Sequence, residues 1–178
     1  MSARAVFLDR DGVLNHVVMR AGRPASPRSV EELQLVPGAA AAVARLREAG
    51  FRTLVVTNQP DVARGLLPPA VLAEMMERVG RATGVDDVAW CPHDDRDGCG
   101  CRKPLPGMIH TLAERWRVDP RRSFLVGDGW KDMAAGRAAG CTTVLLSRPY
   151  NAGTRSTLAS ADLDGAVSAI LEAAEGTV

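Results

Sequence analysis

Two acidic side chains near the start of the chain have the type and spacing needed for chemistry. Residues 6–11 read VFLDRD, so an apolar run ends in Asp9 and Asp11, two residues apart. Side chains alternate along a strand, and both carboxylates would point the same way if the extended geometry persisted. Like charges held so close repel each other unless a cation or a shared proton lies between them. Mg²⁺ is typically held by one or two carboxylates with water and substrate phosphate, so the pair indicates magnesium-assisted phosphoryl transfer. The alternative is a strand followed by a polar Asp-Gly turn.

Further polar side chains follow other apolar runs or lie in the loops after them: Thr57, Asn58, Gln59, Lys103, Asp128 and Asp132. Ligands of open α/β sheets bind at the carboxyl ends of the strands, where hydroxyl and amide groups can hold phosphate oxygens. We therefore expect Asn58 and Gln59 to contact substrate. The plain alternatives are a turn or helix cap at Thr57 and Asn58, a cap at Asp128 and a solvated Lys103.

Three cysteines and one histidine lie together in the segment 91–103, in the pattern Cys-x-His-x₅-Cys-x-Cys. The candidate ligands are Cys91, His93, Cys99 and Cys101. Three thiolates and an imidazole form a closed tetrahedral zinc set with no position free for water, so the metal is expected to be structural. A redox or disulfide cluster is the alternative.

The composition of the chain bounds its class. Its 178 residues are 46% hydrophobic and 24% charged, with a net charge of +1, which predicts one soluble domain spanning residues 1–178. No run of Lys or Arg favours nucleic acid or a membrane surface as a partner. No stretch approaches the roughly 20 apolar residues of a membrane span, and the start lacks a secretory signal pattern. We expect a cytoplasmic monomer that binds a small molecule.

Strand and helix signals alternate along the chain. Strands are expected at residues 5–8, 52–57, 87–91, 123–127 and 142–146. Helices are expected from Pro37 to Gly50, from Pro68 to Gly84, at 106–116, at 132–139 and at 163–174, with a loop at 148–160. Several strands are almost wholly apolar, which predicts a doubly wound, mainly parallel α/β sheet covered by helices on both faces. Trp90 and Trp116 are expected in the core.

In order along the chain, these segments resemble the four motifs of the haloacid dehalogenase-like phosphatases. The segments, spread over residues 5–147, are Asp9-x-Asp11, the strand end at Thr57, Lys103, and Gly127-Asp128-x-x-x-Asp132. The resemblance implies that Asp9 is the nucleophile, and that Asp11 protonates the leaving oxygen and then activates water. It also implies that Mg²⁺ is held by Asp9, the Asp11 carbonyl and Asp128. Thr57 and Lys103 would stabilise charge on the phosphoryl group.

The cysteine-rich segment is similar to that of a zinc-containing branch of this family. Cys-Pro-His at residues 91–93 and Cys-x-Cys-Arg-Lys-Pro-x-Pro-Gly-Met at residues 99–108 carry the resemblance. Members of the branch hydrolyse D-glycero-D-manno-heptose 1,7-bisphosphate at its 7-phosphate, or histidinol phosphate. The resemblance implies a phosphomonoesterase for the heptose bisphosphate, with histidinol phosphate or another small metabolite as the alternative. It implies that Arg102 recognises substrate, because a planar guanidinium suits phosphate or a polyol.

Three segments depart from the branch pattern: residues 16–20, Pro60-Asp61, and Gly129, where a lysine is common. They avoid the nucleophile, the acid and the zinc ligands, and lie where substrate is expected to be read. The stretches from Asn15 to Pro37 and from Cys91 to Pro106 are too short for a cap domain. We therefore expect an open site whose walls are residues 91–103, here called the zinc loop, and residues 17–28. A zinc-stabilised interaction module without catalysis is the alternative from another functional class.

Overall fold

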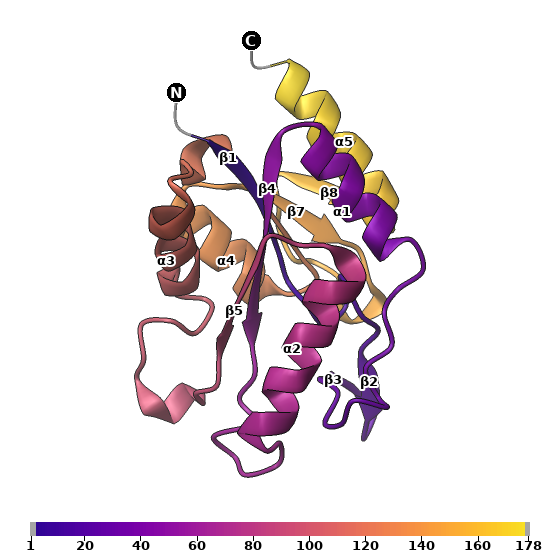
Figure 1. Ribbon diagram of the computed structural model, residues 1–178, viewed down its shortest axis with the longest axis vertical. Helices are drawn as coiled ribbons and strands as arrows, with labels where there is room; N and C mark the ends of the chain where they lie inside the picture. Colours follow the sequence, from indigo (N-terminus) through magenta and orange to yellow (C-terminus); the bar gives the residue numbers. More distant parts are fainter. Residues whose placement is uncertain (1–2, 177–178) are drawn as a thin grey trace.

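A six-stranded sheet runs through the centre of the protein (Figure 1). The structure is a computed structural model and describes residues 3–176. The strands lie in the order β5-β4-β1-β6-β7-β8, and each neighbouring pair is parallel. They are β1 (Arg4–Leu8), β4 (Phe51–Asn58), β5 (Asp87–Cys91), β6 (Phe124–Gly127), β7 (Thr142–Leu146) and β8 (Leu158–Ser160). The predicted parallel α/β sheet is confirmed.

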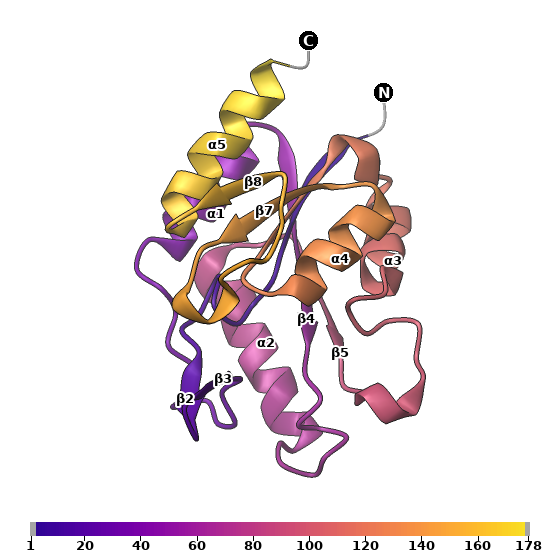
Figure 2. The same ribbon diagram turned by 180° about the vertical axis from the view of Figure 1, so that it is seen from behind.

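Helices cover both faces of this sheet. They are α1 (Ala39–Glu48), α2 (Pro69–Thr83), α3 (Gly107–Trp116), α4 (Trp130–Ala139) and α5 (Leu163–Glu175). The helices α1, α2 and α5 lie on one face, and α3 and α4 on the other (Figures 1 and 2). Within residues 3–176, the connections after β1 and after β5 hold no cap domain, as predicted, and no helix is long and apolar enough to cross a bilayer.

Apolar side chains on both surfaces of the strands explain this double cover. In β1, Val6 and Leu8 pack with α1, α2 and α5, whereas Ala5 and Phe7 pack with α3 and α4. All four side chains are fully buried. The alternation is the period of two that a strand imposes, and burying each large side chain stabilises the fold by about 1.5–3 kcal/mol.

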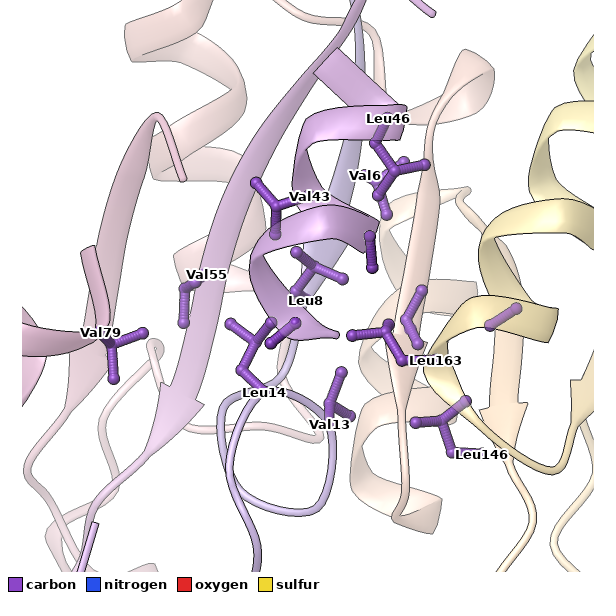
Figure 3. Packing of buried hydrophobic residues seen from close by; sticks show 14 of the residues in the cluster. Val6, Leu8, Val13, Leu14, Val43, Leu46, Val55, Val79, Leu146 and Leu163 are labelled. Atoms are coloured by element: carbon purple, nitrogen blue, oxygen red, sulfur yellow. The ribbon is translucent and has the colours of Figure 1, made fainter. Parts of the chain in front are cut away.

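Two apolar residues anchor the loop that follows β1. Val13 and Leu14 are buried and belong to the same core cluster as Val43 of α1 and Leu163 of α5 (Figure 3). The Leu14 N–H donates to the carbonyl of Arg10 at 2.8 Å, which closes a turn. The loop that carries the two acidic residues is therefore held on the core at the carboxyl end of β1.

The parallel arrangement brings the carboxyl ends of all six strands to one edge of the sheet. From this edge project an antiparallel hairpin of β2 (Val18–Arg20) and β3 (Arg23–Ala25), and the cysteine-rich loop with a short 3₁₀ helix at Asp95–Asp97. Figure 2 shows the hairpin and this loop on opposite sides of the same end of the molecule. They stand where the two walls of the site were expected.

Three expectations about the elements were wrong. The predicted loop at 148–160 contains β8, a short strand without β-branched residues that pairs with the edge of β7. The fourth helix begins at Trp130 instead of residue 132, because the Asp132 carboxylate accepts the Gly129 N–H at 3.0 Å and closes its first turn. Trp90 is 40% exposed instead of buried, because β5 is the outer strand of the sheet.

Candidate active site

A cavity of about 450 Å³ opens at the carboxyl edge of the sheet. Its walls include residues of the hairpin, the start of α4 and the turn after β7. All of the predicted catalytic, magnesium-binding and substrate-binding residues except Gln59 line it: Asp9, Asp11, Thr57, Asn58, Arg102, Lys103 and Asp128. Residues from four strand ends and their loops thus converge on one volume, which an isolated Asp-Gly turn would not require.

Asp9 lies directly after β1 and makes both of its side-chain contacts through Oδ1. This oxygen accepts the Arg10 N–H at 2.7 Å and lies 3.0 Å from Lys103 Nζ. Among the described residues, none donates a hydrogen bond to Oδ2. Burial raises the pKa of Asp9 well above its ordinary value, the Asp132 carboxylate adds to the rise, and Lys103 opposes it. The ionised form of Asp9 is therefore stable only with positive charge close to its carboxylate.

Lys103 is the positive centre beneath the cavity. Its Nζ donates to Asp132 Oδ1 at 2.5 Å and to the Val56 carbonyl at 2.8 Å, in addition to its contact with Asp9. Burial alone would lower the pKa of Lys103, but the carboxylates of Asp132 and Asp9 outweigh it and hold the pKa above its ordinary value. The lysine stays charged, and Asp132, whose role the sequence left open, is its buried partner.

Asp11 lies in a different environment from Asp9. Its carboxylate is paired with the fully buried Arg10 and accepts hydrogen bonds from Asn15 at 2.9 Å, Ser26 at 2.7 Å and Gln59 at 2.9 Å. Burial acts to raise the pKa of Asp11, but Arg10 and these three donors outweigh it, so the pKa lies below its ordinary value. The extended geometry does not persist to Asp11, since β1 ends at Leu8, yet both carboxylates line the cavity.

The Asp128 side chain lines the cavity and packs so closely against residue 12 that this residue must be glycine. Gly12 has φ +78°, and a Cβ there would lie 1.9 Å from Asp128 Oδ2. Burial raises the pKa of Asp128 to about 6, against a hydrogen bond from Tyr150 that lowers it. The close approach keeps a third carboxylate at the edge where β1 and β6 are neighbours.

These acids fit a hard divalent cation. Oxygens of Asp9, Asp128 and Asp132 lie within 4.8 Å of one another. Asp132 is already engaged by Lys103 and the Gly129 N–H, which leaves Asp9 and Asp128 for a cation. Two carboxylates beside an open cavity match the needs of Mg²⁺, which keeps several waters and binds substrate phosphate.

The cysteine-rich loop forms a second candidate metal centre. The Sγ atom of Cys101 lies 3.2 Å from that of Cys91 and 3.4 Å from that of Cys99, and His93 Nδ1 lies 3.5 Å from Cys91 Sγ. A tetrahedron with Zn–S bonds of about 2.3 Å has S···S edges of about 3.8 Å, close to these separations. The four side chains already enclose a zinc-sized space, with no ligand position left for substrate.

The predicted substrate-binding residues have different surroundings. Arg102 lines the cavity, and its guanidinium is tied to the zinc loop, from Nε to Asp95 at 2.7 Å and from Nη1 to the His93 carbonyl at 3.2 Å. Asn58 makes reciprocal hydrogen bonds with the Lys103 backbone, at 2.9 and 3.0 Å. Contact of these two residues with substrate stays a prediction.

Gln59 requires a correction, because it is fully buried and does not line the cavity. Its amide donates to Asp11 at 2.9 Å and to the Thr57 hydroxyl at 3.1 Å. It therefore positions two predicted catalytic side chains, in place of the predicted contact with substrate. The Thr-Asn-Gln pattern marked the strand end, but it held no signal for which amide faces inward.

A chain of ion pairs includes Asp61, whose chain neighbour Pro60 lines the cavity. Arg28 Nε lies 2.7 Å from Asp61, Arg64 Nη1 lies 3.4 Å from Asp61, and Arg64 Nε lies 2.6 Å from Asp94. We call these four residues the rim ion-pair chain. Asp61 was expected where substrate is read, but both of its carboxylate oxygens are paired with arginines. Together the four residues connect the segment after the hairpin, the loop after β4 and the zinc loop.

The family model of the haloacid dehalogenase-like hydrolases matches residues 15–140. The chain belongs to this family. It is therefore an enzyme of the hydrolase class, and the resemblance seen in its motifs is confirmed.

Individual members of the family extend the likeness. The chain is 38% identical over 148 residues to the D-glycero-beta-D-manno-heptose-1,7-bisphosphate 7-phosphatase of Bordetella bronchiseptica, covering 80% of each chain. It is 37% identical over 186 residues to that of Pseudomonas aeruginosa, covering 97% of this chain and 100% of the relative. The crystal structure of the D,D-heptose 1,7-bisphosphate phosphatase from B. bronchiseptica, complexed with magnesium and phosphate, superposes with a TM-score of 0.82 and 34% identity. That match covers 96% of this chain and 99% of the other.

Proposed function

We propose that this protein is a single-domain, magnesium-dependent phosphomonoesterase that removes the 7-phosphate of D-glycero-D-manno-heptose 1,7-bisphosphate. One observation carries the catalytic part: Asp9 lies with Lys103, Asp11 and Asp128 in one open cavity, and among residues 3–176 its contacts are all made through Oδ1. The substrate follows from the two heptose bisphosphate phosphatases to which the chain is 37–38% identical.

Asp9 is the nucleophile in this proposal. Its free oxygen attacks phosphorus, the Asp9–phosphorus bond forms, and the bond from phosphorus to the sugar oxygen breaks. Water then attacks the phosphorus of the aspartyl phosphate, which releases inorganic phosphate and restores the carboxylate. Lys103 stays charged throughout, because Asp132 holds its ammonium group, and it stabilises negative charge on the phosphoryl oxygens.

Asp11 moves the protons. It protonates the departing sugar oxygen in the first step and takes a proton from water in the second. The lowered pKa of Asp11 favours the ionised carboxylate in the free enzyme, and this is the form that can accept a proton in the second step. A substrate phosphate brings negative charge close to Asp11 and raises the pKa of its carboxyl, which suits the first role.

Asp9, the Asp11 carbonyl and Asp128 are the residues that would hold Mg²⁺. The cation would supply positive charge that offsets the repulsion between the carboxylates and the substrate phosphate. Cys91, His93, Cys99 and Cys101 would hold Zn²⁺ as a structural ion. Because two bonds tie Arg102 to this loop, the zinc loop fixes the guanidinium that we expect to read the sugar phosphate.

The test measures phosphate release with Mg²⁺ from the α and β anomers of the heptose bisphosphate and from histidinol phosphate. We expect the bisphosphate to have the highest kcat/KM, and Asp9→Asn to abolish its hydrolysis. Asp164→Asn, on the exposed side of α5, is the matched control and should keep full activity. A preference for histidinol phosphate would overturn the substrate assignment. Activity of Asp9→Asn equal to the control, or no phosphomonoester hydrolysis by the wild type, would overturn the mechanism.

A further inference from the structure

We propose that Tyr150 is a positioning residue that fixes the Asp128 carboxylate in the orientation that binds the cation. The inference rests on the proposed function in one respect, the assignment of Asp128 as a metal ligand. Tyr150 lies in the segment 148–160, which carries none of the family motifs and which the sequence indicated only as a loop. Its hydroxyl donates to Asp128 Oδ2 at 2.5 Å.

The turn that carries Tyr150 also holds the backbone of Asp128. This turn is a short 3₁₀ helix, Pro149–Asn151, directly after β7. The Asn151 amide donates to the Asp128 carbonyl at 2.8 Å and to the Leu146 carbonyl at 2.8 Å. Asp128 is thus bound to this turn through both its main chain and its side chain, and Asn151 ties the turn to the end of β7.

Gly12 approaches Asp128 from the loop after β1. A Cβ on Gly12 would lie 1.9 Å from Oδ2, the same oxygen that the Tyr150 hydroxyl contacts. Oδ2 is therefore confined between the Gly12 backbone and a phenol. Among the described residues, none donates a hydrogen bond to Oδ1, and this oxygen is left for a cation. The hydroxyl removes the rotation that a free Asp carboxylate would keep.

Such partners of metal ligands usually matter for affinity. Loss of a hydrogen bond that orients a ligand typically weakens metal binding by about 10–100-fold. Tyr150→Phe removes the hydroxyl and keeps the ring that lines the cavity. We expect this variant to bind Mg²⁺ about tenfold more weakly, with a kcat that recovers at saturating Mg²⁺ and an unchanged KM for substrate.

Isothermal titration of the substrate-free protein with Mg²⁺ tests the proposal without any turnover. Trp130→Phe is the matched control, because Trp130 lines the same cavity without a hydrogen bond to Asp128, and its Mg²⁺ affinity should equal that of the wild type. The chain contains one tyrosine, so protein labelled at tyrosine gives ring signals from Tyr150 alone. These signals should shift on Mg²⁺ titration with the calorimetric Kd, and the shift should vanish in Asp128→Asn.

A wild-type Mg²⁺ Kd for Tyr150→Phe would overturn the proposal, and a raised KM in that variant would instead make Tyr150 a contact for substrate. Mg²⁺ binding by Asp128→Asn equal to the wild type would overturn it as well, because Asp128 would then not be a ligand. The titration needs no substrate, so a protein that failed to hydrolyse the heptose bisphosphate would still give this result.

Discussion

Replacing Gly12 with alanine should disable the site through the geometry of one carboxylate. A Cβ at Gly12 would lie 1.9 Å from Asp128 Oδ2, and real Cβ contacts begin at about 3.0 Å, so the oxygen must retreat by about 1 Å. Misplacement of a reacting or binding group by 1 Å can lower the rate about 100-fold, which corresponds to about 2.7 kcal/mol of barrier. We expect that loss in kcat/KM, together with weaker Mg²⁺ binding.

The same substitution also has a backbone cost, because an L residue at φ +78° is strained by about 1–2 kcal/mol. Gly50→Ala separates the two effects. Gly50 has φ +83°, a Cβ added there would meet no atom within 4 Å, and the residue precedes β4 at the opposite edge of the sheet.

Both variants should lose similar stability in urea denaturation, and Gly12→Ala alone should lose activity and Mg²⁺ affinity. If Gly12→Ala matched Gly50→Ala in kcat/KM and in the calorimetric Mg²⁺ Kd, the steric argument for Asp128 would be refuted.

Four further predictions concern charge and metals. The pKa of Asp128 is raised to about 6, so the Mg²⁺ Kd measured by calorimetry should rise about tenfold per pH unit below pH 6; a flat profile would contradict the assignment. The folded pKa also exceeds the unfolded value of about 3.9, so this group stabilises the metal-free protein below about pH 4. Urea denaturation should show about 2–3 kcal/mol of that stability lost as the pH rises through 6. Lys103→Met removes the positive charge between Asp9 and Asp132, so it should abolish activity and lower the free energy of unfolding in urea by about 3–5 kcal/mol. An unchanged free energy of unfolding would be evidence against a buried ion pair. Zinc removal, or Cys99→Ser, should lower the Tm and raise the KM; a zinc-free protein with a wild-type Tm and KM would exclude a structural ion.

The fold was predictable because its central strands are almost wholly apolar. Runs such as residues 5–8 and 123–127 lack polar alternation, which only a sheet covered on both faces accommodates. The short strand at Leu158–Ser160 escaped prediction, since it lacks β-branched residues and depends on pairing with β7. Trp90 was placed in the core on its residue type, although its position on the outermost strand leaves it partly in solvent.

The site also contains residues that the sequence predicts and partners that it does not. Asp9, Asp11 and Asp128 follow apolar runs, and parallel topology is enough to predict that strand ends meet. Their partners belong to segments without a local pattern: Ser26 beside Asp11 and Tyr150 beside Asp128 come from stretches that read as loop. Long-range pairing of this kind leaves no trace in the spacing of residues along one chain.

The rim ion-pair chain has a consequence for protein engineering. Asp61 forms ion pairs with Arg28 through one carboxylate oxygen and with Arg64 through the other. Arg64 also forms an ion pair with Asp94 of the zinc loop. The hairpin flank, the loop after β4 and the zinc loop are therefore not independent modules. If the hairpin and Arg28 were moved into a protein without an acid at the position of Asp61, Arg28 would lose its ion-pair partner, so loop exchange aimed at new substrates has to move all three segments together.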